Sequence, residues 1–314
     1  MRYYFAPLEG ITDSIFRKLH SKYFPGIDRY YTPFLSPTVH RGLTAREARE
    51  IPKVVSLTYE AVPQLLTKVS EDFLWLTGVC GDLGYKEVNL NTGCPSGTVT
   101  AKGKGSGMLR DLPALGGFLD EIFAKSPLPI SIKTRIGFYD KDEFPAILEL
   151  YNQYPVKELT IHPRIRAQFY NGSVDMDAFR YALEHSKNPV CYNGDLISLK
   201  KVQAFQKELP QVESVMIGRG LVGDPGMLCP GGTDVAALEG FYDELFAVYT
   251  DVFGGTRNAM FRLKENWRHL LCKFEDSEKL GKRLRKTTDA GEYKAITHEI
   301  FRTLSLREEM LPDW

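Results

Sequence analysis

Short runs rich in β-branched and apolar residues alternate along this chain with stretches that carry apolar residues at helical spacing. Eight such runs precede residue 220. A parallel strand needs a crossover helix before the next strand, so this alternation predicts a (β/α)₈ TIM barrel. The predicted strands are Tyr3 to Ala6, Arg29 to Thr32, Val54 to Leu57, Glu87 to Leu90, Ile130 to Lys133, Leu159 to Ile161, Val190 to Tyr192 and Ser214 to Ile217.

After Gly231 the alternation stops, and only helix-like stretches follow. We therefore predict a barrel domain over residues 1–234 and a smaller all-helical domain over residues 235–314. The predicted helices of the barrel include Thr12 to Lys22, Gln64 to Val79, Leu112 to Phe123, Phe144 to Tyr154, Met176 to Glu184 and Leu199 to Glu208, and those of the tail are Val235 to Phe253, Asn258 to Phe274, Glu278 to Lys286 and Glu292 to Thr303.

The composition excludes several classes of protein. With 43% hydrophobic and 25% charged residues, the chain is typical of a soluble globular protein. It has no apolar run of membrane-spanning length and no signal-peptide core, so we expect a cytoplasmic protein that does not enter membranes. Its five cysteines form no C-x-x-C pair and accompany no histidine cluster. That pattern argues against a metal site and a disulfide framework, so we expect reduced thiols. We separately expect a monomer.

The formal net charge of zero hides an asymmetry between the two predicted domains. Residues 256–302 contain twelve Lys or Arg and seven Asp or Glu, an excess of +5, which leaves −5 for the remainder. A basic helical tail indicates a polyanionic partner. The alternative is an ordinary solvated helix face, which an excess of this size also permits.

Barrel enzymes build their active sites from residues that follow the strands. Nearly every chemically versatile or glycine-rich position of this chain falls at such a strand exit. These positions are Pro7 to Glu9, Gln64, Asn91 and Cys94, Lys133 and Arg135, His162 and Arg164, Asn193 to Asp195, and Gly218 to Gly220.

Two glycine-containing loops follow the last two predicted strands, where barrels often bind phosphate. The two loops are Asn193 to Asp195 and Gly218 to Gly220. Arg219 adds a guanidinium that can donate two hydrogen bonds to a phosphate. Gly218 to Gly223 also fits G-x-G-x-x-G, but the following Asp224-Pro225 forbids the long helix of a Rossmann fold. Because two such loops follow adjacent strands, we favour a binding site for a phosphorylated ligand over two turns with a purely structural role.

Cys94 and Lys133 each have two interpretations, one purely structural and one functional. A cysteine is often a small buried hydrophobe, and a lysine at a strand end often reaches to solvent. On the turn after a barrel strand, however, Cys94 is placed to meet a ligand. Lys133 could stabilise the charge on a reduced flavin.

Six motifs in order resemble the tRNA-dihydrouridine synthase family, from residue 6 to about 228. That resemblance implies an FMN-binding barrel, a tRNA-binding helical domain, and reduction of a D-loop uridine with NADPH or NADH as electron donor. The motifs are Ala6 to Arg17, Asn91 to Pro95 with its continuation to Leu109, Lys133 to Gly137, His162 to Arg164, Asn193 to Asp195, and Ile217 to Gly220.

The resemblance also implies residue roles. Cys94 is the general acid that protonates C5 of the uracil, and Asn91 helps to hold the uracil; a thiol with a pKa near 8.5 is protonated at neutral pH. The residues that would bind FMN are Pro7, Leu8, Glu9, Gln64, Lys133, His162, Asn193, Gly194, Asp195, Gly218 and Arg219.

The residues expected to contact tRNA lie beside Cys94, at two strand exits and in the basic tail. One position departs from the family pattern, because Ile165 stands where a threonine commonly follows the arginine. Residues 262–267 resemble the bacterial subgroup that modifies position 16. The expected tRNA contacts are Lys102, Lys104, Arg135, Arg164, Arg166, Arg262, Lys264, Arg268, Arg283, Arg285 and Lys286.

Two rival functions stay open on the sequence alone. The first is an FMN barrel that reduces a small unsaturated substrate, in the manner of dihydroorotate dehydrogenases. The second is a tRNA-binding protein without catalytic activity. The basic tail argues against the first rival, and the set Cys94, Lys133 and His162 argues against the second.

Overall fold

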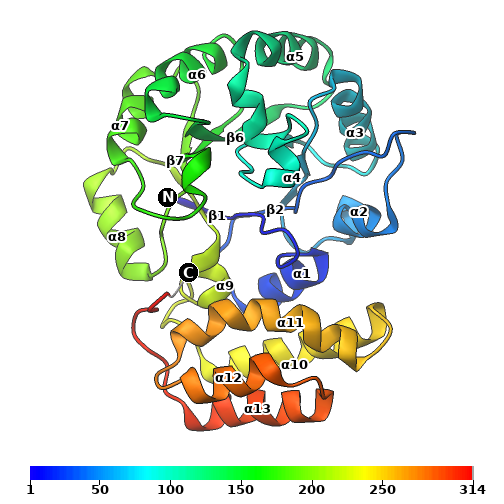
Figure 1. Cartoon of the computed structure of the whole chain (residues 1–314), viewed down its shortest axis with the longest axis vertical. Coiled ribbons are helices and arrows are strands. Elements are labelled where there is room, and N and C mark those ends of the chain that lie inside the picture. The colour runs from blue at the N-terminus through cyan, green and yellow to red at the C-terminus, as the bar shows by residue number, and fades with distance from the viewer. Residues whose placement is uncertain (313–314) are drawn as a thin grey trace. The chain divides into compact units, whose positions relative to one another are not determined.

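The computed structural model describes residues 1–312 and contains one sheet of nine parallel strands (Figure 1). The strand order is β3-β2-β1-β9-β8-β7-β6-β5-β4. Only Pro63 separates the two edge strands β3 and β4 in the chain, so the sheet curls into a nearly closed barrel, as predicted. The strands are β1 (Arg2–Phe5), β2 (Arg29–Tyr31), β3 (Ala61–Val62), β4 (Gln64–Leu65), β5 (Val88–Thr92), β6 (Ile130–Gly137), β7 (Leu159–Ile165), β8 (Val190–Tyr192) and β9 (Ser214–Ile217).

The predicted third strand, Val54 to Leu57, is wrong. Val54–Ser56 forms a short 3₁₀ helix, and the side chain of Val55 is 92% exposed. Val54 and Val55 are β-branched and therefore favour a strand by propensity, but this segment does not pair with the sheet. The third position of the barrel is filled by β3 and β4 instead.

Pro63 explains why this third strand is divided. Proline has no N–H for a ladder, so β3 pairs with β2, whereas β4 pairs with β5 and forms an isolated bridge to Leu35. The Pro63 carbonyl still accepts the N–H of Asn89 at 2.8 Å. Gln64 therefore lies in the barrel wall and not beyond the strand.

Side chains of β5, β6 and β7 alternate between the outer helices and the barrel interior. On the outward set, the hydroxyls of Thr92 and Thr134 lie 2.9 and 3.3 Å from the hydroxyl of Tyr151 on α6. The alternate positions face inward and are mostly polar. In register across the strands they are Asn89 with Ser131, Asn91 with Lys133, Lys133 with Thr160, and Arg135 with His162.

Helices α3, α5, α6 and α7 surround these strands (Figure 1). Asp111 and Asp175 cap α5 and α7 by accepting a backbone N–H three residues on. The predicted helix Gln64 to Val79 starts too early, because residues 64 and 65 belong to β4. The helices of this part are α2 (Ala45–Glu50), α3 (Ser70–Asp82), α4 (Gly97–Thr100), α5 (Leu112–Lys125), α6 (Phe144–Tyr151) and α7 (Met176–His185).

The chain forms two compact units. The first unit comprises Met1–Pro7, Arg29–Gly194 and Pro210–Met216, and the second comprises Leu8–Asp28, Asp195–Leu209 and Ile217–Trp314. The second unit thus contains α1 and α8 besides the C-terminal helices. The predicted domain boundary at residue 234 stays a prediction.

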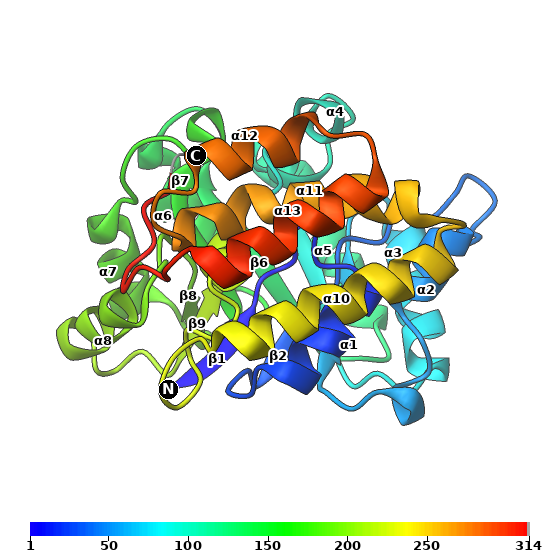
Figure 2. The same cartoon turned by 90° about the horizontal axis from the view of Figure 1, so that it is seen from below.

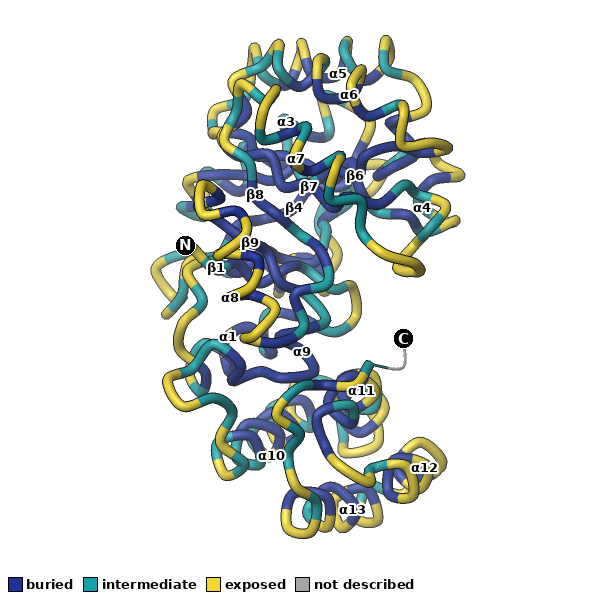
Figure 3. Tube along the Cα trace, turned by 90° about the vertical axis from the view of Figure 1, so that its left-hand side faces the viewer, coloured by how far each residue is buried: buried dark blue, intermediate teal, exposed yellow. Residues whose placement is uncertain are grey.

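Helices α10 to α13 form the core of the second unit, and Figure 2 shows them as neighbouring rods. Their buried faces are aromatic: Trp267 donates its indole N–H to the Tyr293 hydroxyl at 2.8 Å. Figure 3 shows buried residues on the inner faces and exposed residues on the outer turns. The helices of this unit are α1 (Ser14–Tyr23), α8 (Leu199–Glu208), α9 (Arg219–Gly223), α10 (Val235–Val252), α11 (Thr256–Leu270), α12 (Glu278–Lys286) and α13 (Ala290–Thr303).

The predicted C-terminal helices agree with these elements to within a few residues. The tail is therefore helical, as expected. Within residues 1–312, no helix combines the length and apolarity that crossing a membrane requires.

Candidate active site

Cys94 lies on a turn two residues after β5, and hydrogen bonds hold this turn from both sides. The side-chain oxygen of Asn91 accepts the backbone N–H of Gly93 at 3.0 Å and that of Cys94 at 2.9 Å. The hydroxyl and backbone N–H of Ser106 donate to the Cys94 carbonyl at 2.8 and 3.1 Å. The half-buried thiol is therefore carried by a fixed backbone.

A glycine makes room for this turn. Gly105 has φ of +57°, and a Cβ there would lie 2.9 Å from the Cys94 carbonyl oxygen and 3.0 Å from the Cys94 Cβ. Only glycine meets both demands without strain. The glycine-rich loop after Cys94 thus packs closely against the cysteine.

A chain of hydrogen bonds between buried side-chain amides holds the Asn91 side chain, and we call this chain the amide relay. Asn91 donates its Nδ2 to Gln64 Oε1 at 2.7 Å, and Gln64 donates its Nε2 to Asn89 Oδ1 at 2.8 Å. Asn89 then donates its Nδ2 to the hydroxyl of Ser131 at 2.9 Å. Since each amide uses its oxygen and its nitrogen, the relay fixes which way each side chain points.

Sequence reasoning found Gln64 and Asn91 but missed Asn89 and Ser131. The missed signal was the alternation of polar and apolar residues in Val88–Thr92, which places both asparagines on one face of the strand.

Lys133 is half-buried inside β6, opposite Asn91 on β5. Its ammonium has no hydrogen-bond or ion-pair partner among residues 1–312. Burial lowers the pKa of Lys133 to about 8, and the positive charge of Arg135 also lowers it. A half-buried cation without a partner is costly, so this position fits an acceptor supplied by a ligand.

Arg135 and Arg164 are each only 1% exposed and bond carbonyls of the chain itself, and their expected contact with tRNA stays a prediction. Arg135 donates to three carbonyls: Gly93 at 3.0 Å, Ile165 at 2.9 Å and Phe169 at 2.5 Å. Burial lowers the pKa of Arg135 to about 10. This arginine therefore ties the Cys94 turn to the segment after β7.

Arg164 is the last residue of the predicted motif His162 to Arg164, and its side chain is held by contacts within the first unit. Its guanidinium lies 3.1 Å from Nε2 of His162 and donates to the Gly172 carbonyl at 2.5 Å. At Ile165, the backbone makes the contacts, since its N–H donates to Gln168 Oε1 at 2.9 Å and its carbonyl accepts from Arg135. The missing threonine hydroxyl thus leaves this turn intact.

The two predicted phosphate loops have tight backbones. In the first unit, Asn193 donates its side-chain amide to the Met216 carbonyl at 2.7 Å, and a Cβ at Gly194 would lie 2.8 Å from the Tyr192 hydroxyl oxygen. In the second unit, Arg219 lies 3.2 Å from Asp195 in an ion pair, so part of its charge is compensated.

The remaining predicted cofactor residues lie near β1 and at the start of α9. Pro7 lies two residues after β1, in the first unit, and is half-buried. In the second unit Leu8 donates its N–H to the Thr12 hydroxyl at 2.9 Å, Glu9 is exposed, and Gly218 precedes α9.

The predicted tRNA contacts in the first unit have different surroundings. Lys102 is exposed, whereas Lys104 donates to the Ser36 hydroxyl at 2.8 Å. Burial lowers the pKa of Lys104 from its ordinary value. The guanidinium of Arg166 lies between the rings of Phe138 and Phe169.

In the tail, three of the predicted basic side chains already have local partners. Arg262 lies over the ring of Phe253 at 3.7 Å, and Lys264 donates to the carbonyls of Arg285 and Thr287 at the end of α12. Arg283 pairs with Glu299 at 3.0 Å. The exposed predicted cations Arg268, Arg285 and Lys286 are the better candidates for phosphate.

A groove of about 750 Å³ lies along this basic surface, between α11, α12 and the segment that ends at Leu311. Arg268 and Arg285 line it together with Arg307, and Phe261 adds an exposed ring. Its lining therefore combines positive charge with apolar area.

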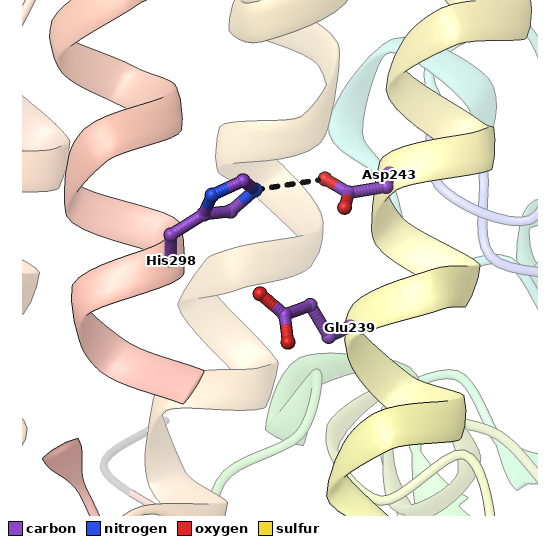
Figure 4. A group of neighbouring side chains, drawn as sticks. All are labelled: Glu239, Asp243 and His298. Atoms are coloured by element: carbon purple, nitrogen blue, oxygen red, sulfur yellow. Dashed lines mark hydrogen bonds and ion pairs between the residues drawn. The ribbon is translucent and has the colours of Figure 1, made fainter. Parts of the chain in front are cut away.

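A separate cluster of titratable groups joins α10 to α13 (Figure 4). His298 Nε2 lies 3.3 Å from Asp243 Oδ1, and the carboxylate of Glu239 is one turn away. The arrangement is an ion pair when His298 is protonated. The expectation that the protein binds no metal stays a prediction.

These observations define the class of protein: a parallel barrel whose adjacent strands carry a cysteine turn, the Lys133 ammonium and a relay of buried amides. Solved structures of similar fold include morphinone reductase, with a TM-score of 0.50, 12% identity, and coverage of 72% of this chain and 84% of that chain. At that identity the likeness shows the fold alone.

Residues 4–238 match the family model of the dihydrouridine synthases. The chain therefore belongs to the dihydrouridine synthase family, and the resemblance of its motifs to that family is confirmed. Membership favours a tRNA-dihydrouridine synthase over either rival function.

Curated relatives agree. The chain is 28% identical to a probable tRNA-dihydrouridine synthase of Rickettsia conorii, over 71% of this chain and 67% of that protein. It is 30% identical to a probable tRNA-dihydrouridine synthase 1 of Synechocystis, over 70% and 61%. It is 26% identical to the tRNA-dihydrouridine synthase B of Pasteurella multocida, over 71% and 67%.

Proposed function

We propose that this protein reduces a uridine of tRNA to dihydrouridine, with bound FMN and with NADPH as the electron donor. The observation that carries the proposal is the family match, which spans Cys94, Lys133 and His162 within residues 4–238. The net reaction adds a hydride to C6 and a proton to C5 of the uracil, and it oxidises one NADPH.

The donors inside the barrel fit the polar edge of a flavin. The ammonium of Lys133 has no partner among the described residues, and a flavin gains negative charge near N1 and O2 when it is reduced. Gln64 and His162 lie on β4 and β7, in the same wall as Lys133. When bound, FMN would take electrons from NADPH and supply the hydride.

Cys94 is proposed as the proton donor at C5. Hydride arrival at C6 leaves enolate charge on C5 and O4, and a nearby thiol can neutralise it. The Asn91 oxygen holds the Cys94 backbone, and Arg135 holds the preceding Gly93 carbonyl. These contacts keep the thiol in one place while the uracil enters.

The exposed arginines and lysines of α11 and α12 are proposed to bind the tRNA backbone. A uridine inside folded tRNA must leave its stack to reach the barrel, so contacts to other parts of the tRNA must hold the rest of the molecule. Position 16 of the D-loop remains the proposed target, on the resemblance of residues 262–267.

The direct experiment uses purified protein and tRNA transcripts, which contain only unmodified uridine. A bound flavin absorbance near unit stoichiometry and NADPH-dependent gain of two mass units in one uridine are expected. Sequencing of the product places the dihydrouridine, and parallel reactions with NADH determine the preferred donor.

The matched variants are Cys94→Ala and Cys229→Ala, because Cys229 is also half-buried and lies outside the candidate site. Cys94→Ala should lower turnover at least about 100-fold while flavin content and tRNA affinity stay unchanged. Cys229→Ala should retain full turnover. A wild-type protein that binds no flavin, or that reduces only a free pyrimidine, would refute the proposal.

A further inference from the structure

We propose that Arg110, Phe138, Arg166 and Phe169 form a binding surface for one unpaired nucleotide of the tRNA, adjacent to the target uridine. This inference rests on the proposed function. We call these four residues the arginine–aromatic stack. Of these four residues, only Arg166 was expected from the sequence to contact tRNA.

The stack alternates cations and rings in the first unit, where Phe138 is buried and Phe169 carries the exposed ring. The Arg110 guanidinium carbon lies 5.0 Å from the centre of the Phe138 ring. That of Arg166 lies 5.4 Å from the Phe138 ring and 5.2 Å from the Phe169 ring. All three distances are within the range of cation–π attraction. The side chains are therefore ordered relative to one another before any ligand binds.

Phe169 has a conformation that packing alone does not explain. Its φ is +50°, a left-handed backbone that bulky residues rarely adopt, yet its ring remains 39% exposed. Its carbonyl accepts from Arg135 at 2.5 Å, and its N–H donates to the Arg166 carbonyl at 3.1 Å. Strain of this kind clusters at functional sites, and here it presents an apolar ring to solvent.

The turn that carries Phe138, at the other end of the stack, is also held by hydrogen bonds. The Glu143 carboxylate accepts the backbone N–H groups of Phe138 at 2.7 Å and of Tyr139 and Asp140 at 2.9 Å. This turn holds the Phe138 ring against both arginines and leaves Tyr139 68% exposed. Phe138 is only 9% exposed, so it supports the two arginines from inside, and the exposed Phe169 ring is the one on which a flat ligand can stack with little loss of entropy.

The charge of the surface matches a nucleotide. Within residues 1–312, neither Arg110 nor Arg166 forms an ion pair with a carboxylate. Unpaired bases stack on aromatic rings and guanidinium planes, and arginine forks bind the adjoining phosphate. We therefore assign the Phe169 ring to the base and the two arginines to its phosphate.

Two arginines connect the stack to the Cys94 turn. Arg110 donates to the carbonyls of Thr100 at 2.9 Å and Gly107 at 3.2 Å, in the loop that follows Cys94. Arg135 bridges the carbonyls of Gly93 and Phe169. The stack is thus built on the same backbone that carries the thiol, which fits a nucleotide next to the one that reacts.

Phe169→Gly tests the ring, because glycine accepts the φ of +50° and removes the aromatic group without new strain. We expect the dissociation constant for the tRNA transcript and the KM for tRNA to rise between about 5-fold and 100-fold. Flavin content and the rate of flavin reduction by NADPH should not change. Phe169→Trp keeps a stacking ring and should restore tRNA affinity.

Arg166→Ala and Arg110→Ala test the charges. Each should lower the slope of log affinity against log salt by about one, whereas Phe169→Gly should leave that slope unchanged. If Phe169→Gly binds and turns over tRNA like the wild type, the inference is wrong. If the wild type makes no dihydrouridine, the proposed function fails, and equal tRNA affinities of the wild type and Phe169→Gly would overturn the stack separately.

Discussion

The side-chain oxygen of Asn91 lies 2.9 Å from the backbone nitrogen of Cys94 and accepts its N–H. Asn91 belongs to β5, so the position of the thiol is set by a buried residue of the barrel wall. The relay through Gln64 extends this support to the neighbouring strand β4. The candidate catalytic turn is therefore part of the barrel and not of a mobile loop.

Asn91→Ala should misplace Cys94. The substitution leaves two backbone N–H groups and the Gln64 oxygen without their partner, which costs about 1–3 kcal/mol of unfolding free energy. Dihydrouridine formation should fall more than flavin binding does. Asn91→Asp keeps the acceptor for both N–H groups and should retain more activity than Asn91→Ala. Equal activities of the two variants would contradict the positioning role of the oxygen.

Gly105→Ala should damage the same turn from the other side. An alanine there would have an unfavourable φ of +57° and a Cβ 2.9 Å from the Cys94 carbonyl oxygen. We expect a loss of about 1–3 kcal/mol in stability and a clear loss of turnover. Gly97→Ala is the matched control, since it lies in the same loop and its Cβ would meet nothing within 4 Å. Denaturant unfolding and turnover of both variants check the contrast.

Lys133 should give the flavin-free protein a distinct pH dependence. Its pKa is about 8 in the folded chain, below the ordinary value of 10.5. Between these values the unfolded chain binds more protons, so stability rises with pH. Below pH 8 both states are protonated, and the full desolvation cost persists. Urea unfolding from pH 7 to 10 should therefore show wild type gaining stability relative to Lys133→Gln, and parallel curves would place Lys133 in solvent.

The exposed cations of the tail should differ from the paired ones in tRNA binding. Arg268→Ala and Arg285→Ala should each weaken binding and reduce the salt slope by about one. Arg283→Ala should have a smaller effect, because Arg283 already pairs with Glu299 at 3.0 Å. Titrations with labelled transcript at several salt concentrations measure all three. A larger effect at Arg283 would show that its ion pair opens on binding.

The barrel was predictable because its evidence is local. Apolar runs of strand length and helix-length periodicity each reflect burial of one face, and their order alone implies parallel crossovers. The one wrong strand, Val54 to Leu57, shows the limit of that evidence. Its composition favours a strand, but pairing with β2 and β5 selects residues 61–65 despite Pro63.

Residue types at the strand exits also indicated most of the candidate site. They could not reveal the contacts that Arg135 and Arg164, both expected to contact tRNA, make within the chain. Both guanidiniums bind carbonyls of the chain itself, and those of Ile165 and Phe169 are 30 and 34 positions away from Arg135. No local pattern records which backbone oxygens the fold will bring to an arginine.

The sequence by itself determined the alternating barrel, the helical basic tail and the family, because burial periodicity and ordered motifs are properties of neighbouring residues. The tertiary structure alone decided which polar groups meet. It joined Ser131, Asn89, Gln64 and Asn91 into one relay, and it set Phe169 against Arg166. Such contacts depend on strand register and loop closure, which bring distant residues within hydrogen-bonding or stacking distance.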